Sequence, residues 1–402
     1  MSAQNSHSPP APPPARKLYF PYLDLARAAA VTLVFVYHLV ILMNWTGFPS
    51  SGIFSVFRVG WIGVDLFFVI SGFVISLSLI RSIEDFGSNG YIKPYFRNRL
   101  ARVVPLYFLT SWCFLVLVEP QWFARPPQQL WTNLLSHVFF VHNLWPEYAG
   151  ALNGPAWSLG VEMQFYVFMA LVFKWLPVRR PLLVGCAFMV IALAWRAAVC
   201  YTFEVGFDTS FDAYTFNTLF IRTQQLPGTL DAFGLGCVLA LIMRRRDHGF
   251  HKYLHANWKN SVSWLVAAMI FSAVSWKILW SHSIAYLNFS GMFWNFPVMV
   301  IFFKLLLAIT FACWVGFLVS LPAHGWLIRI LSPVSYIGKI SYGIYLWHML
   351  VILSVMKISM AHPWQATALI AVLTLAIASF SWHFFEQPLI RKYHDKSLRA
   401  GG

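Results

Sequence analysis

Ten apolar runs, each close to the length that a helix needs to cross a bilayer, constrain this fold more than any other feature of the sequence. A transmembrane helix takes about 20 consecutive, mostly apolar residues, and it satisfies its own backbone hydrogen bonds. We therefore predict an all-α polytopic membrane protein of about ten transmembrane helices. A shorter apolar segment at 130–145 is typical of an interfacial or re-entrant helix. The ten runs lie near 22–43, 61–80, 103–119, 157–176, 182–200, 227–243, 261–280, 296–320, 340–358 and 365–386.

The amino-acid composition is typical of an integral membrane protein. Hydrophobic residues make up 59% of the 402 residues and charged residues only 11%, whereas soluble domains carry about 25% charged residues. The net charge of +15 would suggest a nucleic-acid partner in a soluble protein. Here most basic residues lie in short loops between apolar runs, so we expect a lipid bilayer and no nucleic acid as the partner.

The basic residues also predict an orientation. If the N-terminus is cytoplasmic, 21 of the 29 lysines and arginines fall in cytoplasmic segments. The positive-inside rule then predicts that both termini are cytoplasmic, which agrees with an even number of spans.

The chain is predicted to contain one membrane domain. Residues 1–17 are rich in Pro and Ala and are expected to be a disordered cytoplasmic tail. The first apolar run is too long for the core of a cleaved signal peptide, so we expect an uncleaved anchor. Residues 18–390 form the transmembrane domain, and residues 391–402 form a basic cytoplasmic tail.

The first span contains three polar residues that lipid disfavours. Asp24, Arg27 and His38 all lie in this run, and ionisable residues inside spans are candidates for function. Arg27 and His38 are eleven residues apart, which places them on one helix face and about 16 Å apart along the axis. We expect Arg27 near the cytoplasmic end and His38 beyond the midplane.

Asp65 lies in the second span at the depth of His38. A carboxylate there can accept from one ring nitrogen of His38 and leave the other nitrogen as a base. The structural alternative is that Asp65 caps the turn at Gly60–Gly63. We favour the pairing with His38, because an unpaired carboxylate in the membrane is costly.

The fourth span begins with unusually polar residues. Trp157, Ser158 and Glu162 lie in its outer half, at a depth similar to that of His38. Helix capping would explain Ser158 but not Glu162. Asp231 is a further acid in the outer half of its span and a weaker candidate.

An arginine cluster lies at the cytoplasmic start of the third span. Arg97, Arg99 and Arg102 fall within six residues, and such clusters bind phosphates bidentately. For any one of them alone, cytoplasmic anchoring is the favoured explanation. His348 in the ninth span is by itself typical of a satisfied interior residue.

We predict no metal site. His248, His251 and His255 have a spacing that could hold a metal ion, but no acid or cysteine supports them. They are explained as part of a solvated, basic loop.

Six motifs in the same order resemble acyltransferase family 3, a family of integral-membrane acyltransferases. They are LDLARAAAVTLVFVYH, GWIGVDLFFVISGFVI, YFRNRLARVVPLY, PAWSLGVEMQFYVF, SYGIYLWH and FFEQP, and they span about Tyr19 to Pro388.

The resemblance implies transfer of an acyl group, usually acetyl from cytosolic acetyl-CoA, to an extracytoplasmic glycan such as lipopolysaccharide O-antigen or exopolysaccharide. It implies a multi-pass protein of the bacterial inner membrane and an acceptor that is a glycan or a lipid-linked glycan. Some members carry a fused extracytoplasmic domain, which we do not expect here because the chain ends soon after the tenth span. The family's Arg and His fall on Arg27 and His38.

We therefore predict three groups of site residues. The catalytic residues are His38, Asp65 and Glu162; the donor is bound by Arg27, Arg97, Arg99 and Arg102; the substrate site includes Trp157, Ser158, Asp231 and His348.

Two mechanisms and two other functions remain open at this point. His38 either acts as a general base on a sugar hydroxyl or carries the acyl group covalently. A proton-coupled lipid or sugar transporter would also place acids and histidines inside the bundle. A purely structural scaffold would leave Arg27, His38 and Asp65 unexplained.

Overall fold

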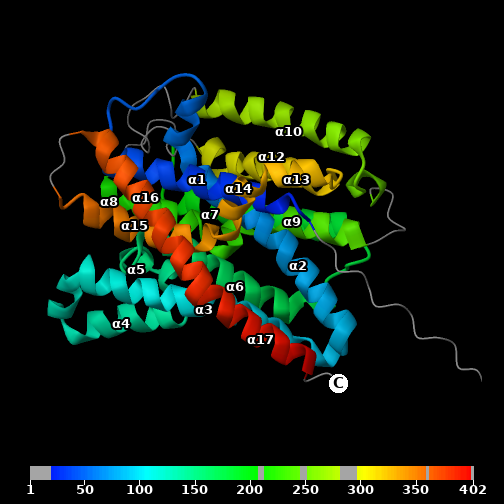
Figure 1. Cartoon of the computed structure of the whole chain (residues 1–402), viewed down its shortest axis with the longest axis horizontal. Coiled ribbons are helices and arrows are strands. Elements are labelled where there is room, and N and C mark those ends of the chain that lie inside the picture. Colours follow the sequence, from blue (N-terminus) through cyan, green and yellow to red (C-terminus); the bar gives the residue numbers. More distant parts are fainter. Residues whose placement is uncertain (1–19, 207–211, 245–250, 281–296, 359–361, 400–402) are drawn as a thin grey trace, which may run out of the picture.

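The computed structural model is built of helices that run between the two ends of the molecule (Figure 1). It describes residues 20–206, 212–244, 251–280, 297–358 and 362–399. The tail predicted over 1–17, the last three residues of the predicted C-terminal tail, and His248 lie outside the described residues.

The prediction of about ten transmembrane helices is confirmed. Nine helical segments of the described residues are long and apolar enough to cross a membrane, and a bent pair of helices makes a tenth. The first five fall on α1 (Leu23–Leu42), η1 with α2 (Ile53–Ile62, Gly63–Gly90), α3 (Ile92–Leu117), α6 (Trp157–Val172) and α7 (Pro181–Thr202). The next four fall on α9 (Leu226–Arg244), α10 (Trp258–Leu279), α12 (Lys304–Ser320), and α16 with α17 (Pro363–Ser381, Gln387–Arg399).

The ninth span in chain order is broken near its start. Helices α14 (Ser332–Lys339) and α15 (Ser341–Val355) meet at an angle of 68°. The first of them packs against α1. The break brings Ser341 and Tyr342 to the wall of the cavity that contains Arg27.

The two ends of the bundle differ. The chain enters α1 and leaves α17 at the same end, as Figure 1 shows. The short helices α4 (Pro127–Val138), α5 (Pro146–Ala149) and α8 (Ala213–Thr223) gather at the opposite end. The segment predicted to be interfacial or re-entrant thus forms α4 and the turn η3 (His142–Leu144), both too short to cross a bilayer.

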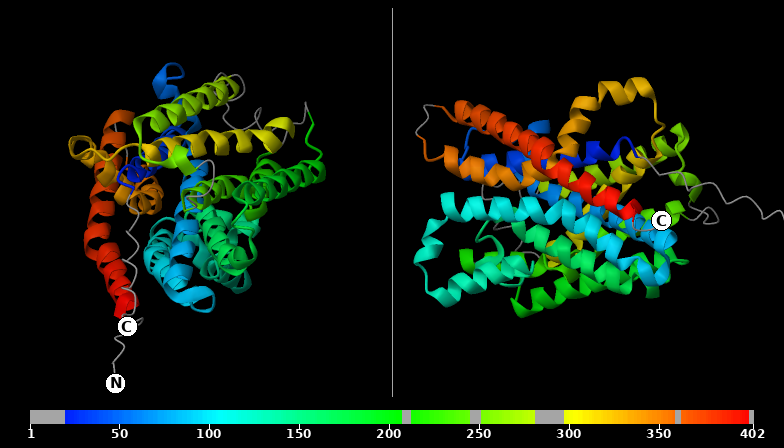
Figure 2. Two further views of the ribbon diagram at one scale, coloured as in Figure 1. Left: turned by 90° about the vertical axis from the view of Figure 1, so that its right-hand side faces the viewer. Right: turned by 60° about the horizontal axis from the view of Figure 1, so that its bottom comes forward.

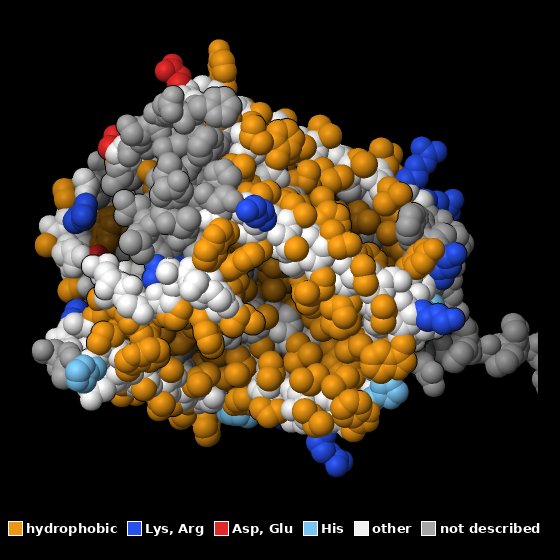
Figure 3. All heavy atoms as spheres, turned by 90° about the horizontal axis from the view of Figure 1, so that it is seen from above, with side chains coloured by type: hydrophobic (Ala, Val, Ile, Leu, Met, Phe, Trp, Pro, Cys, Tyr) orange, Lys and Arg blue, Asp and Glu red, His pale blue; other side chains and the backbone are white. Residues whose placement is uncertain are grey.

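The sides of the bundle are apolar. Figure 3 shows a surface covered with hydrophobic side chains, with Lys and Arg gathered mainly toward the end that holds the termini. Helix α10 lies at the rim, and α16 and α17 stay on the outside in both views of Figure 2. Val262, Val266, Met269 and Ile270 of α10 are exposed. Such a continuous apolar face is stable in contact with lipid but unfavourable in contact with water.

The interior is organised by the crossing of α2 and α9. A Cβ atom on Gly72 would lie 2.1 Å from the carbonyl oxygen of Phe233, and one on Gly236 would lie 2.1 Å from that of Val69. Only glycine permits the two backbones to approach this closely. The ring of Phe233 stacks on that of Phe165 of α6 at 4.0 Å between centroids. These contacts pack α2, α6 and α9 into one core.

Replacing Gly72 by Ala should destabilise the protein, because the added methyl group meets backbone and not a movable side chain. Overpacking of this kind costs about 1–3 kcal/mol, and thermal unfolding of the detergent-solubilised protein would measure it. Gly325→Ala is the matched control, since a Cβ there has nothing within 4 Å. Equal unfolding temperatures for the two variants would contradict the close crossing of α2 and α9.

Candidate active site

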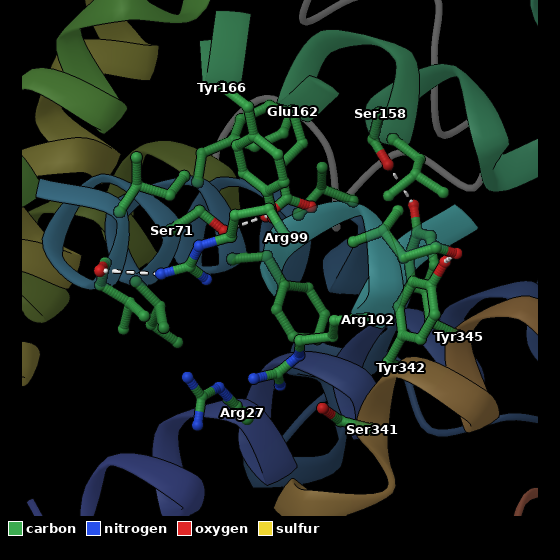
Figure 4. Close-up of a pocket in the computed structure, with 18 residues that line it drawn as sticks. Arg27, Ser71, Arg99, Arg102, Ser158, Glu162, Tyr166, Ser341, Tyr342 and Tyr345 are labelled. Atoms are coloured by element: carbon green, nitrogen blue, oxygen red, sulfur yellow. Dashed lines mark hydrogen bonds between the residues drawn. The ribbon is translucent and has the colours of Figure 1, made fainter. Parts of the chain in front are cut away.

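Arginines from two helices converge on one cavity, named here the arginine cavity. Arg27 of α1 and Arg99 and Arg102 of α3 line it together with Glu162 of α6 (Figure 4). Its volume is ≈ 100 Å³. Its other polar lining residues are Ser71, Ser158, Tyr166, Ser341, Tyr342 and Tyr345.

The arginines of this cavity are held in place but keep donors available. Arg27 forms an ion pair with Asp24 at 2.6 Å. Arg99 donates to the carbonyl of Val74 at 3.1 Å and lies over the ring of Tyr166. A guanidinium carries five N–H donors, so each retains donors for an anion. The predicted grouping of Arg27, Arg99 and Arg102 is therefore seen, whereas Arg97 does not line this cavity.

Glu162 belongs to the arginine cavity and not to the surroundings of His38. Its Oε1 accepts from the hydroxyls of Ser71 at 2.5 Å and Tyr166 at 2.8 Å (Figure 4). Glu162 and His38, predicted at similar depth, therefore line different cavities, and a catalytic role of Glu162 stays a prediction. Equal depth in two spans does not make two side chains neighbours, because the faces of their helices must also meet.

A second cavity, named here the His38 cavity, contains the histidine itself. Its volume is ≈ 240 Å³. Val34, Tyr37 and His38 of α1 line it together with Lys304 of α12, whose ammonium group lies 4.7 Å from the centroid of the Trp61 ring. The complete set also includes Trp61, Val64, Gly154, Pro155, Trp157, Phe216, Phe220 and Tyr345.

The partner of His38 is His348 and not Asp65. Nδ1 of His38 lies 2.9 Å from the carbonyl oxygen of Val34 and 3.2 Å from Nε2 of His348. Nδ1 of His348 lies 3.1 Å from the carbonyl oxygen of Ile344. Carbonyl oxygens only accept, so both Nδ1 atoms carry the proton in this arrangement. Nε2 of His38 is then the nitrogen with a free lone pair, which is the form of a general base.

Asp65 is instead paired with a lysine that sequence reasoning missed. The ammonium group of Lys304 donates to its two oxygens at 3.0 and 2.8 Å, and both side chains are buried. The predicted hydrogen bond from His38 to Asp65 is thus wrong, because α12 supplies a cation to the face of α2 that bears the acid. A lysine within the apolar run 296–320 was the available signal, since such residues are rare in spans.

Asp231 has a second buried partner. Arg196 of α7 donates to its carboxylate at 2.6 Å and to the carbonyl of Gly228 at 3.1 Å. The side chains of Arg196 and Asp231 are each 1% exposed. Its carboxylate holds α7 to α9, and the contribution of Asp231 to the substrate site stays a prediction.

Two residues separate the arginine cavity from the His38 cavity. Val64 and Tyr345 line both of them. The hydroxyl of Tyr345 lies 2.6 Å from that of Ser158 and 2.9 Å from the carbonyl oxygen of Pro155. Ser158, predicted at the substrate site, thus holds the residue between the two cavities.

A third cavity, named here the outer vestibule, continues from the His38 cavity. His38, Gly154, Trp157 and Phe220 line both, and its volume is ≈ 500 Å³. Trp157, predicted at the substrate site, thus lies in the wall shared by these two cavities. The remaining lining residues are Glu119, Trp122, Arg125, Pro146, Glu147, Ala149, Gly150, Ala151, Asn217 and Ile221.

A buried polar layer positions the start of α6. The rings of His137 and His142 stack at 4.1 Å between centroids, and Nε2 of His142 lies 3.0 Å from the carbonyl oxygen of Ala156. Gln164 donates to Asn143 at 2.6 Å. Burial lowers the pKa of His137 to about 3 and that of His142 to about 4. Both rings are therefore neutral at pH 7, and this layer is a support without charge.

Comparisons with known proteins agree with this arrangement of motifs. The family model of the acyltransferase domain matches residues 20–383. The peptidoglycan O-acetyltransferase OatA of Listeria monocytogenes is 28% identical over 396 residues, which is 92% of this chain and 56% of that protein. YrhL of Bacillus subtilis, provisionally named for the same activity, is 28% identical over 401 residues, which is 92% of this chain and 55% of YrhL.

A third relative is a protein of Staphylococcus aureus (strain COL) provisionally named as an O-acetyltransferase. It is 25% identical over 412 residues, covering 94% of this chain and 58% of the relative. The chain thus spans a little over half the length of these curated relatives. No solved structure matches it. Because the family model covers nearly the whole chain, this protein belongs to the acyltransferase domain family.

Proposed function

We propose that the protein transfers an acyl group, in the first place acetyl, from acyl-CoA on the cytoplasmic side to a hydroxyl of an extracytoplasmic glycan. The observation that carries this proposal is the series of three cavities with shared walls. Arginines line the first, and His38 lies between the second and the third. The proposal includes a bacterial inner membrane with both termini in the cytoplasm, which the basic loops support.

In this proposal, the arginine cavity receives the donor's phosphates. Arg27, Arg99 and Arg102 offer planar donors that match phosphate oxygens bidentately. The pantetheine arm then passes Val64 and Tyr345, and the thioester reaches the His38 cavity. The axial distance from Arg27 to His38 of about 16 Å suits the length of that arm.

His38 is proposed as the general base. Nε2 takes the proton of the acceptor hydroxyl as the oxygen bonds to the thioester carbonyl carbon, which forms a tetrahedral oxyanion. Collapse of the oxyanion breaks the carbon–sulfur bond, and the thiolate leaves with the proton from Nε2. His348 stabilises the transient imidazolium, because its Nε2 accepts from Nδ1–H of His38.

Lys304 is proposed to stabilise the oxyanion. Its ammonium group lines the same cavity as His38, and Asp65 fixes its position through two hydrogen bonds. A fixed cation in a site with little water lowers the free energy of a developing negative charge. Asp65 is then a positioning residue for Lys304.

His38→Ala should reduce acceptor acylation by about 10²–10⁴-fold, because it removes the proposed general base. The measurement is transfer of radiolabelled acetyl from acetyl-CoA to the acceptor by protein in detergent, with thermal unfolding as the folding control. Near wild-type transfer by this variant would contradict the proposal. Label retained on the wild-type protein without acceptor would indicate the mechanism in which His38 carries the acyl group covalently. A protein that only transports would show neither acetyl transfer nor cleavage of the thioester.

Arg99→Gln and Arg102→Gln should each raise KM for acetyl-CoA by about tenfold or more, since each removes a charged donor to phosphate. We expect a smaller effect on kcat, because neither guanidinium reaches the reacting atoms. Arg180→Gln is the matched control, an exposed arginine in the loop between α6 and α7. An unchanged KM in both cavity variants would rule out the arginine cavity as the donor site.

Lys304→Met should lower the free energy of unfolding by about 3–5 kcal/mol, because it leaves the buried Asp65 carboxylate without its cation. The double variant Asp65→Asn with Lys304→Met should regain most of this stability but not activity. We expect its kcat to stay about 10²–10³-fold below wild type. Recovery of both stability and kcat would assign Lys304 a structural role only.

A further inference from the structure

The outer vestibule contains side chains that the proposed transfer chemistry does not use. Three separate outer segments supply them: the chain around η2 (Pro120–Ala124), α5 and α8. Its volume of ≈ 500 Å³ lies within the range of ligand-binding sites. The vestibule shares His38 and Trp157 with the His38 cavity, so a molecule bound in it lies next to the proposed base.

The polar groups of the vestibule are mostly acceptors. Glu147 is held by the hydroxyl of Tyr214, which donates to Oε1 at 3.1 Å. Glu119 accepts from the side-chain amide of Gln121. An ionised carboxylate has about four acceptor positions, so each retains capacity after these contacts. Asn217 adds an amide that can both donate and accept. Such a set suits a ligand that carries many hydroxyl groups.

Aromatic faces lie between these polar groups. Trp122 and Trp157 line the same space, and both belong to the packed interior at that end of the bundle. The guanidinium of Arg125 lies 4.4 Å from the centroid of the Trp122 ring, so this charge is held against an aromatic face. Rigid rings beside hydrogen-bonding groups match a sugar, which has apolar C–H faces and a rim of hydroxyls.

The charges of the vestibule favour some ligands over others. Two carboxylates and one guanidinium line it, so the acidic side chains outnumber the basic one. Like charges brought together at a binding surface suppress the wrong partner. A ligand dense in carboxylate or phosphate groups is therefore disfavoured, and an amino-bearing one gains from Glu119 and Glu147.

We infer that the outer vestibule is a saccharide-binding site for neutral or amino-bearing sugar units. It holds the units that adjoin the sugar whose hydroxyl reaches His38. The saccharide site is argued from the residues that line the vestibule. Only the statement that a bound sugar presents its hydroxyl to His38 rests on the proposed function.

Binding of defined oligosaccharides to the full chain in detergent tests the inference without any acyl donor. Calorimetric titration with chitotetraose, with its deacetylated tetramer and with tetragalacturonic acid compares a neutral, an amino-bearing and an anionic ligand. We expect the first two to bind and the anionic ligand to bind at least about tenfold more weakly. Glu119→Gln combined with Glu147→Gln should weaken binding of the deacetylated tetramer by about tenfold. The difference in affinity between this amino-bearing ligand and the anionic one should become smaller.

The matched control is Glu204→Gln, an exposed glutamate that is absent from the vestibule lining. It should leave all three affinities unchanged. Preference for the anionic ligand, or equal effects of the control and the double variant, would overturn the inference. Wild-type protein that binds the oligosaccharides with the expected selectivity but neither cleaves acetyl-CoA nor transfers acetyl would reject the proposed function alone. Transfer that is insensitive to the double variant would reject the saccharide site alone.

Discussion

A charge among apolar helices is costly unless an opposite charge or hydrogen bonds compensate it, and this requirement determines much of the interior. Moving an ion out of water costs several kcal/mol even after relaxation. Asp65 of α2 is matched by Lys304 of α12, and Asp231 of α9 by Arg196 of α7. Each pair joins two helices that are distant in sequence. Asp65 and Asp231, two acids that the sequence suggests for the site, are therefore engaged in ion pairs.

That commitment explains the character of the proposed base. With Asp65 engaged by Lys304, the imidazole of His38 is oriented by a carbonyl and by the neutral ring of His348. A neutral support does not hold a proton on the base as a carboxylate does. The ammonium group of Lys304 is fixed by Asp65 in the wall of the same cavity, where negative charge is proposed to develop.

The sequence predicts the parts of the fold that depend on the length of an apolar run. It predicts fewer of the contacts that depend on which helix faces pack together. All ten spans follow from apolar runs of sufficient length, because lipid leaves the backbone little alternative. The grouping of Arg27 with Arg99 and Arg102 also follows from their positions at one end of their helices. The partners of His38, Asp65 and Asp231 do not follow, since depth along a span leaves rotation about its axis free. The close crossing at Gly72 and Gly236 and the break between α14 and α15 settle those rotations, and both are properties of the packed bundle.

The contact of Tyr345 with Ser158 has a consequence for the membrane as well as for the reaction. Three cavities in series through a bundle would form a leak for protons and ions if they joined freely. Tyr345 and Val64 stand where the first two meet, and the tyrosine is fastened by its hydroxyl to Ser158 and Pro155. In the proposed reaction, an acyl chain that displaces this ring fills the opening that it creates. Transfer of the acyl group would then leave the electrical insulation of the bilayer intact.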